Sequence, residues 1–194
     1  MFKSFVKGAI IALVALLSLT IGFALSYYTT INQPKNNSIM FRHYTINEIS
    51  IAEYGAIKHV SGLIRQRNHT GIEKERSIYK AYLLIDAANR EGLCPALLVA
   101  VAQVESDFTH HTTRNHANAI GIMQLTPIIE NKYGINGSNL EENIQTGAKF
   151  ISHLVDRYDG DYELVLNHYV GGSYRYVKEV LDVWDGISKA LYSG

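Results

Sequence analysis

The stretch PALLVAVAQVE, residues 95–105, decides the fold that the sequence predicts. Proline suits the first turn of a helix. Residues 95–104 contain no charged residue, so the predicted helix is apolar around most of its circumference. Such a helix must be buried on most of its sides. We therefore expect residues 95–105 to form a buried helix within a compact domain.

The segments on either side also have helical periodicity, because apolar residues recur at steps of three and four. The predicted helices cover residues 46–65, 73–91, 127–132, 140–158, 161–170 and 174–190. We expect the helix at 46–65 to pack onto the domain, and a position on a membrane surface is the alternative. The sequence contains neither a strand-rich region nor a repeat, so it predicts an all-α fold.

The length of 194 residues fits one domain of about 100–150 residues with an additional segment. A hydrophobic content of 47% and only three prolines are typical of a folded protein. The 18 basic residues equal the 18 acidic residues, which gives no electrostatic basis for binding nucleic acid. The single cysteine, Cys94, excludes an intramolecular disulfide and a thiolate metal cluster, and we expect a small buried side chain there.

An apolar run occupies residues 8–26, GAIIALVALLSLTIGFALS, and follows Lys3 and Lys7. Its length is close to the ~20 residues that a membrane-spanning helix needs, and the lysines favour a cytoplasmic position for the end before it. We therefore expect an uncleaved transmembrane anchor. Small residues at 24–26 leave open the alternative of a signal peptide that is cleaved before Tyr27.

Glu105 has a chemically unusual position for an acid. It follows Leu97 and Val101 at intervals of four residues and therefore shares the apolar face of the buried helix. Burial and the negative end of the helix dipole both favour the protonated carboxyl, so we expect a raised pKa. A neutral carboxylic acid near pH 7 can act as a general acid. The alternative is a side chain that reaches solvent where the helix ends.

Short motifs follow one another in a definite order along the chain. They are Glu105-Ser106, AIGIMQLTP at residues 119–127, Asn143-Ile144 with Gly147, and Tyr169 with Gly172. Their order and separation resemble those of the soluble lytic transglycosylase (SLT) catalytic domain, a lysozyme-like fold that cleaves peptidoglycan. The resemblance covers about residues 77–185, and it implies an all-α, lysozyme-like helical domain behind the N-terminal transmembrane helix.

The resemblance implies that Glu105 is the single catalytic acid and base, supported by Ser106. Glu105 would protonate the oxygen of the β-1,4 bond between N-acetylmuramic acid and N-acetylglucosamine. It would then take the proton of the muramic acid C6 hydroxyl, which gives a 1,6-anhydro end. The acetamido group of the substrate can replace a second carboxylate, and Asp107 would point about 200° away from Glu105 on a continuing helix. Neither a metal nor a cofactor is required.

Five further residues would bind the substrate by the same resemblance. Met123 and Gln124 would line the subsite next to the scissile bond, and Gly121 would let the backbone approach the sugar. Tyr169 would place its hydroxyl near Glu105, and Tyr176 would line the cleft. For Met123 and Tyr169 an ordinary core position is the alternative.

The sequence departs from the family at residues 168–172, where HYVGG stands in place of the common Ala-Tyr-Asn-Ala-Gly and Val170 replaces an amide. Two alternatives therefore stay open: a goose-type-like muramidase that delivers water, and a weakly active or inactive peptidoglycan-binding assembly protein. The loop with His110, His111 and His116 lacks the spacing of metal ligands on one helix face, so we expect it to be solvated.

The predicted organisation has three parts. Residues 1–33 form the membrane anchor or uncleaved signal segment, residues 34–72 a tether with a membrane-proximal helix, and residues 73–194 the lysozyme-like catalytic domain. The expected partners are peptidoglycan glycan strands, the membrane through residues 8–26, and an apparatus for secretion, conjugation or phage genome delivery. The expected location is the inner membrane with the catalytic domain in the periplasm, or the virion membrane if a phage encodes the protein.

Overall fold

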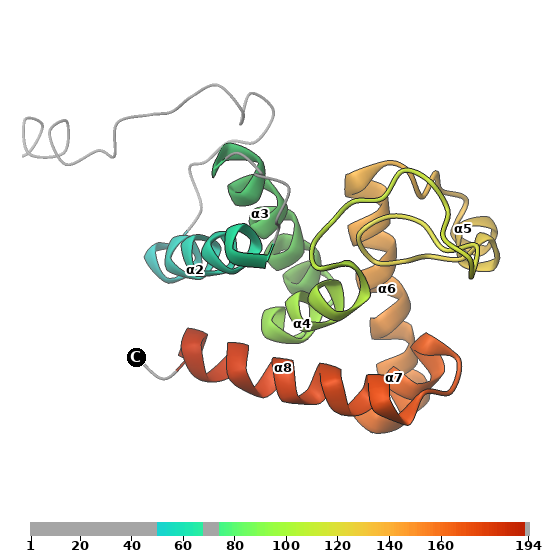
Figure 1. Ribbon diagram of the computed structural model, residues 1–194. Coiled ribbons are helices and arrows are strands. Elements are labelled where there is room, and N and C mark those ends of the chain that lie inside the picture. Colours follow the sequence, from blue (N-terminus) through green and yellow to red (C-terminus); the bar gives the residue numbers. More distant parts are fainter. Residues whose placement is uncertain (1–49, 68–73, 193–194) are drawn as a thin grey trace, which may run out of the picture. The chain divides into compact units, whose positions relative to one another are not determined.

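The structure, a computed structural model, describes residues 50–67 and 74–192, which belong to one compact unit. The helices of these residues are α2 (Ile51–Arg67), α3 (Lys74–Arg90), α4 (Pro95–Ser106), α5 (Pro127–Tyr133), α6 (Leu140–Arg157), α7 (Tyr162–Val170) and α8 (Tyr174–Tyr192) (Figure 1). In these ranges the only β-type pairing is an isolated bridge between Ile120 and Leu125. The prediction of an all-α fold is therefore confirmed for the described part of the chain.

Helix α4 forms the buried centre of this unit. Every residue from 96 to 103 is buried, and the helix packs against α3 and α8. Pro95 occupies the first position, where a helix needs no backbone N–H. At the other end Asp107 and Phe108 adopt positive φ angles of 47° and 61°, and their N–H groups bond the carbonyls of the last helical turn. The chain reverses there, so Glu105 lies in the final turn of the helix.

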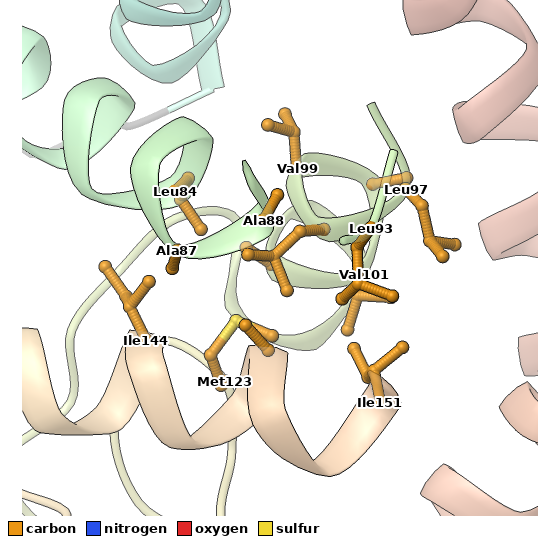
Figure 2. Close-up of a cluster of buried hydrophobic side chains, with 14 of the residues drawn as sticks. Leu84, Ala87, Ala88, Leu93, Leu97, Val99, Val101, Met123, Ile144 and Ile151 are labelled. Carbon is orange, nitrogen blue, oxygen red and sulfur yellow. The ribbon is translucent and has the colours of Figure 1, made fainter. Parts of the chain in front are cut away.

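The part of the hydrophobic core around Met123 joins three helices and one turn. Figure 2 shows Leu84 and Ala88 of α3, Val101 of α4 and Ile144 of α6 around Met123, which comes from the turn at 121–124. The side chain of Met123 has no exposed surface. The turn is therefore anchored in the hydrophobic core, and the carbonyl oxygen of Ile122 lies 2.8 Å from the Ser106 hydroxyl at the end of α4.

Helix α2 packs against α3, as the sequence predicted for this segment. Its buried apolar side chains are Ile57, Val60 and Ile64. The hydroxyl groups of Ser61 and Ser77 lie 2.7 Å apart in the same buried contact. The predicted helix began at residue 46, but residues 46–49 lie outside the described ranges.

The expectation of a buried Cys94 needs correction. Its side chain is half-buried, and the sulfur lies 4.0 Å from the hydroxyl oxygen of Tyr192. Cys94 is the residue that precedes the first turn of α4, so its position in the connection between α3 and α4 leaves part of the side chain accessible.

None of the described helices is both long enough and apolar enough to cross a bilayer. The predicted anchor at residues 8–26 lies outside the described residues, so it stays a prediction.

The last two helices bring a second group of side chains towards the end of α4. Asp161 accepts a hydrogen bond from the N–H of Leu164 and begins α7, whereas Gly171, with a φ of 78°, ends it. Residues 171–173 then lead into α8, which packs against both α4 and α7. This connection places side chains of α7 and α8 beside the carboxyl end of α4.

Candidate active site

Glu105 is a half-buried carboxyl at the end of α4. Desolvation raises its pKa from the ordinary value of 4.5 to about 7, and a hydrogen bond from Tyr176 opposes part of this shift. The Tyr176 hydroxyl donates to Oε1 of Glu105 at 2.6 Å. At neutral pH the protonated and ionised forms of Glu105 are therefore both well populated, which suits a group that gives and then takes a proton.

Two tyrosines interact with this carboxyl, one through a hydrogen bond and one through its charge. Tyr169 donates to the backbone carbonyl of Met123 at 2.8 Å, whereas Tyr176 donates to Glu105 itself. Burial, followed by the negative charge of Glu105, raises the pKa of both tyrosines, so both remain hydrogen-bond donors at neutral pH. The sequence placed the Tyr169 hydroxyl near Glu105. In the structure the tyrosine that bonds Glu105 directly is Tyr176, for which the sequence had predicted only a position in the lining of the cleft.

Ser106 connects the end of α4 to the neighbouring turn. Its hydroxyl oxygen lies 2.8 Å from the carbonyl oxygen of Ile122 and 3.1 Å from that of Ala102. Both partners are acceptors, so the single hydroxyl proton is shared between them. The Ser106 hydroxyl therefore donates to backbone carbonyls of the protein. A contact of Ser106 with a sugar or with the Glu105 carboxyl stays a prediction.

The turn between Ile120 and Leu125 carries the next predicted site residues. Ile120 and Leu125 exchange two backbone hydrogen bonds of 2.9 Å each. Inside the turn, the amide nitrogen of Gln124 donates to the Gly121 carbonyl at 2.7 Å, and its amide oxygen accepts from Asn115 at 2.7 Å. Gln124 is half-buried. Its side chain is therefore held against the turn, with part of its surface accessible to a ligand.

The side chain of Asn143 in α6 forms hydrogen bonds with the backbone of this turn. The sequence motif included Asn143 but gave it no role. It is fully buried, and its Oδ1 accepts from the Met123 N–H at 2.9 Å. Its Nδ2 donates to the carbonyls of Ile120 and Gly137 at 3.0 Å each. One side-chain amide therefore satisfies three backbone groups that water does not reach.

Two glycines of the motifs leave space for neighbouring side chains: Gly121 for that of Asn143 and Gly147 for that of Met123. A Cβ on Gly121, which has a φ of 83°, would lie 2.1 Å from Nδ2 of Asn143. A Cβ on Gly147 would lie 2.7 Å from Cγ of Met123. The sequence related Gly121 to the approach of a sugar, and the structure adds that a side chain there would collide with Asn143.

The other acidic and histidine candidates have different surroundings. Asp107 is exposed, and its Oδ1 lies 3.7 Å from Nη1 of Arg67 in α2. The Nε2 atom of His110 lies 2.8 Å from the carbonyl oxygen of Ser138. Within residues 50–67 and 74–192, no three His, Cys, Asp or Glu side chains are grouped so that they could hold a metal ion.

Replacing Tyr176 with Phe is expected to raise the pKa of Glu105 above 7, because the lost hydrogen bond stabilises the ionised carboxyl. A hydrogen bond to a charged group contributes about 1.5–3 kcal/mol, which corresponds to a shift of about one pH unit or more. Carbon-13 NMR titration of the Glu105 carboxyl measures the shift directly. Tyr174→Phe, a change at an exposed tyrosine of the same helix, is the control and should leave the pKa unchanged. An equal or lower pKa in Tyr176→Phe would contradict the prediction.

Comparison with known proteins gives matches over the part of the chain that carries this site. The sequence model of the family "Transglycosylase SLT domain" matches residues 82–183. The membrane-bound lytic murein transglycosylase C of Histophilus somni is 31% identical over 103 residues, which cover 47% of this chain and 27% of that protein. The transglycosylase of Enterobacteria phage PRD1 is 35% identical over 88 residues, which cover 45% of this chain and 32% of that protein.

Among solved structures, an inactive mutant of the lytic transglycosylase Slt from Pseudomonas aeruginosa matches with a TM-score of 0.50 and 21% identity. The match covers 60% of this chain and 27% of that chain, and it shows a likeness of fold. The chain thus spans between a quarter and a third of the length of these relatives.

Proposed function

The chain belongs to the transglycosylase SLT domain family, and we propose that it is a peptidoglycan lytic transglycosylase with Glu105 as its single acid and base. The proposal has the chain cleave the β-1,4 bond between N-acetylmuramic acid and N-acetylglucosamine and leave 1,6-anhydro ends. The observation that carries it is the raised pKa of Glu105, about 7, in a half-buried site where Tyr176 holds one carboxyl oxygen.

In the first step, protonated Glu105 donates its proton to the glycosidic oxygen as the bond from that oxygen to C1 of muramic acid breaks. Tyr176 bonds Oε1, so the proton passes through the other carboxyl oxygen, Oε2. The acetamido oxygen of the substrate stabilises the positive charge that develops at C1. The Asp107 carboxylate faces Arg67 and takes no part in this step.

In the second step, ionised Glu105 accepts the proton of the muramic acid C6 hydroxyl while that oxygen forms a bond to C1. Glu105 is again protonated, and no water is consumed. The Tyr176 hydroxyl stabilises the carboxylate between the two steps, because a hydrogen bond to the charged form favours it.

The remaining site residues have two kinds of role in this proposal. Gln124 and Tyr176 reach the substrate. Ser106, Gly121, Met123 and Tyr169 position the turn and the end of α4 through the contacts described above.

The test is mass spectrometry of the muropeptides released when the full chain, in detergent, is incubated with peptidoglycan sacculi. Anhydromuramic ends are the expected product. Reducing muramic ends would overturn the proposal in favour of a muramidase that uses water. Retention on sacculi without any release would overturn it in favour of a peptidoglycan-binding assembly protein.

The proposal also places the catalytic domain, residues 73–194, at the cell envelope. Residues 1–33 anchor it in the inner membrane, and residues 34–72 connect the two parts. Support comes from the apolar run at 8–26 and from the relative in Histophilus somni, whose name describes it as membrane-bound. If a phage encodes the protein, the proposed place is the virion membrane, and one of the relatives is a transglycosylase of phage PRD1. Alkaline extraction of membranes followed by intact-mass measurement tests this: a soluble chain that begins at Tyr27 would contradict the anchor.

A further inference from the structure

Asn115 is an exposed residue of the loop between α4 and the turn at 121–124, and its side chain contacts Gln124. Its Oδ1 accepts from the backbone N–H groups of Ala117 and Ala119 at 2.9 Å each. Both of these groups are donors, so the other end of the Asn115 amide, Nδ2, must be the one that faces Gln124. Nδ2 donates to Oε1 of Gln124 at 2.7 Å. The backbone of the loop therefore decides which way the Asn115 amide points.

The contact with Asn115 in turn decides the orientation of the Gln124 amide. Because Oε1 of Gln124 faces the Asn115 donor, Nε2 faces the carbonyl of Gly121, to which it donates at 2.7 Å. An amide nitrogen carries two N–H groups, and within the described residues Nε2 of Gln124 uses only one of them. Gln124 is half-buried. Its amide therefore keeps one N–H of fixed orientation for an acceptor outside the protein.

The loop that carries Asn115 is itself held against α5. Arg114 donates from Nη2 to the Glu130 carboxylate at 2.6 Å and from Nη1 to the Asn118 carbonyl at 2.9 Å. Glu130 is buried, and its other carboxylate oxygen accepts from the Gly137 N–H at 2.9 Å. The backbone on either side of Asn115 is therefore fixed before any ligand binds.

Hydrogen bonds connect the turn that carries Gln124 to the residues around Glu105. The carbonyl oxygen of Ile122 lies 2.8 Å from the hydroxyl of Ser106, the residue that follows Glu105. Tyr169 donates to the carbonyl of the residue before Gln124 at 2.8 Å, and the negative charge of Glu105 acts on this tyrosine. Gln124 therefore belongs to the turn that borders the candidate catalytic acid.

We propose that Asn115 is a positioning residue, which holds the Gln124 amide so that its remaining N–H donates to an acceptor oxygen of the sugar beside the scissile bond. The inference rests on the proposed function, because it assumes that Gln124 reaches a glycan strand. The two ends of an amide have nearly the same shape, so without the Asn115 donor the Gln124 amide can turn over and present its oxygen. A sugar carbonyl only accepts hydrogen bonds, so the turned amide loses this contact.

Asn115→Asp tests the inference in the full chain, in detergent. The carboxylate still accepts from the Ala117 and Ala119 N–H groups, so the loop is preserved, but an acceptor replaces the donor to Gln124. We expect KM for sacculi to rise about threefold to tenfold, the value of one neutral hydrogen bond, while kcat and the melting temperature stay unchanged. Thr113→Asp adds the same charge at another exposed residue of this loop, and it should leave KM unchanged.

A double-mutant cycle separates positioning through Gln124 from a general effect of the loop. In a chain that carries Gln124→Ala, Asn115→Asp should not raise KM further, because the amide that Asn115 holds is missing. A rise as large in that background as in the parent would overturn the inference. An unchanged KM in Asn115→Asp alone would overturn it too.

Nitrogen-15 NMR of the Gln124 side-chain amide gives a readout that does not depend on activity. The resonances of this amide should shift in Asn115→Asp, because its hydrogen-bond partner has changed, and should stay in place in Thr113→Asp. Resonances that are the same in Asn115→Asp as in the parent would show that Asn115 does not hold the amide, which overturns the inference.

Failure of the inference is distinguishable from failure of the proposed function. If the parent releases no anhydromuramic ends, the proposed function is wrong, and sedimentation with sacculi then replaces KM in the same cycle. Weaker sedimentation of Asn115→Asp than of the parent, with no such difference in the Gln124→Ala background, supports the positioning role. Equal sedimentation of the parent and Asn115→Asp, or a parent that does not sediment, overturns it.

Discussion

Changing Glu105 to Gln is expected to lower the release of anhydromuramic ends by about a thousandfold or more, because one carboxyl serves as both acid and base. The amide has nearly the same shape, but it neither donates an acidic proton nor accepts one. Release is measured by mass spectrometry of soluble muropeptides, and sedimentation with sacculi should show that binding is retained. Asp107→Asn is the matched control at the neighbouring carboxyl, which faces Arg67, and it should keep its activity. An active Glu105→Gln variant, or an inactive Asp107→Asn variant, would contradict the assignment.

The same variant makes a prediction about stability. In the folded chain the pKa of Glu105 is about 7, against an ordinary value of 4.5, so the folded state holds this proton more tightly than the unfolded state. The resulting stabilisation is fully present below pH 4.5 and is lost as the pH rises through 7. The parent should therefore melt at a lower temperature than Glu105→Gln at pH 8 and at a similar temperature at pH 4.5. Circular dichroism melts at the two pH values check this, and a parent that is the more stable protein at pH 8 would contradict it.

Replacing Asn143 with Ala is expected to lower the free energy of unfolding by about 3–5 kcal/mol. The change leaves the Met123 N–H and the Gly137 carbonyl without their side-chain partner in a buried place, and each such group costs about 1–3 kcal/mol. The Ile120 carbonyl loses one of its two donors and keeps the Leu125 N–H. Urea denaturation followed by circular dichroism measures the loss.

The control for this prediction is Asn167→Ala, at an exposed asparagine of α7, which should change stability by no more than about 0.5 kcal/mol. Asn143→Asp offers a second comparison, because it keeps the acceptor for the Met123 N–H but removes both donors. We expect it to be destabilised as well. An Asn143→Ala variant that unfolds at the same urea concentration as the parent would show that the turn does not depend on this amide.

The sequence predicted the helices well because their signals are local. The predicted bounds of α3 and of α5 to α8 agree with the structure within two residues. Each signal depends on only a few neighbouring residues. The signals are the apolar residues at three- and four-residue steps, Pro95 at the start of α4 and Gly171 at the end of α7. The burial of α4 also followed from its composition, since a helix without a polar face has no side to expose.

The contacts inside the site were less predictable because they join distant segments. Tyr176 and Glu105 are 71 positions apart, and their hydrogen bond depends on how α8 crosses α4. The partner of the Tyr169 hydroxyl is a backbone carbonyl, which leaves no mark in the sequence. The three partners of Asn143 are backbone groups too. Sequence motifs therefore named candidate residues of the site, whereas the partners of these residues required the packing of the helices.

The close fit among Gly121, Asn143, Gly147 and Met123 also restricts how this region can evolve. A methyl group at position 121 collides with the amide at 143, and one at 147 collides with the side chain at 123. Substitutions at contacting positions have non-additive effects, so a change harmful alone can be tolerated after its neighbour has become smaller. Drift at this turn is therefore expected to proceed through paired substitutions in a preferred order, with the residue on α6 or in the core changing before its glycine does.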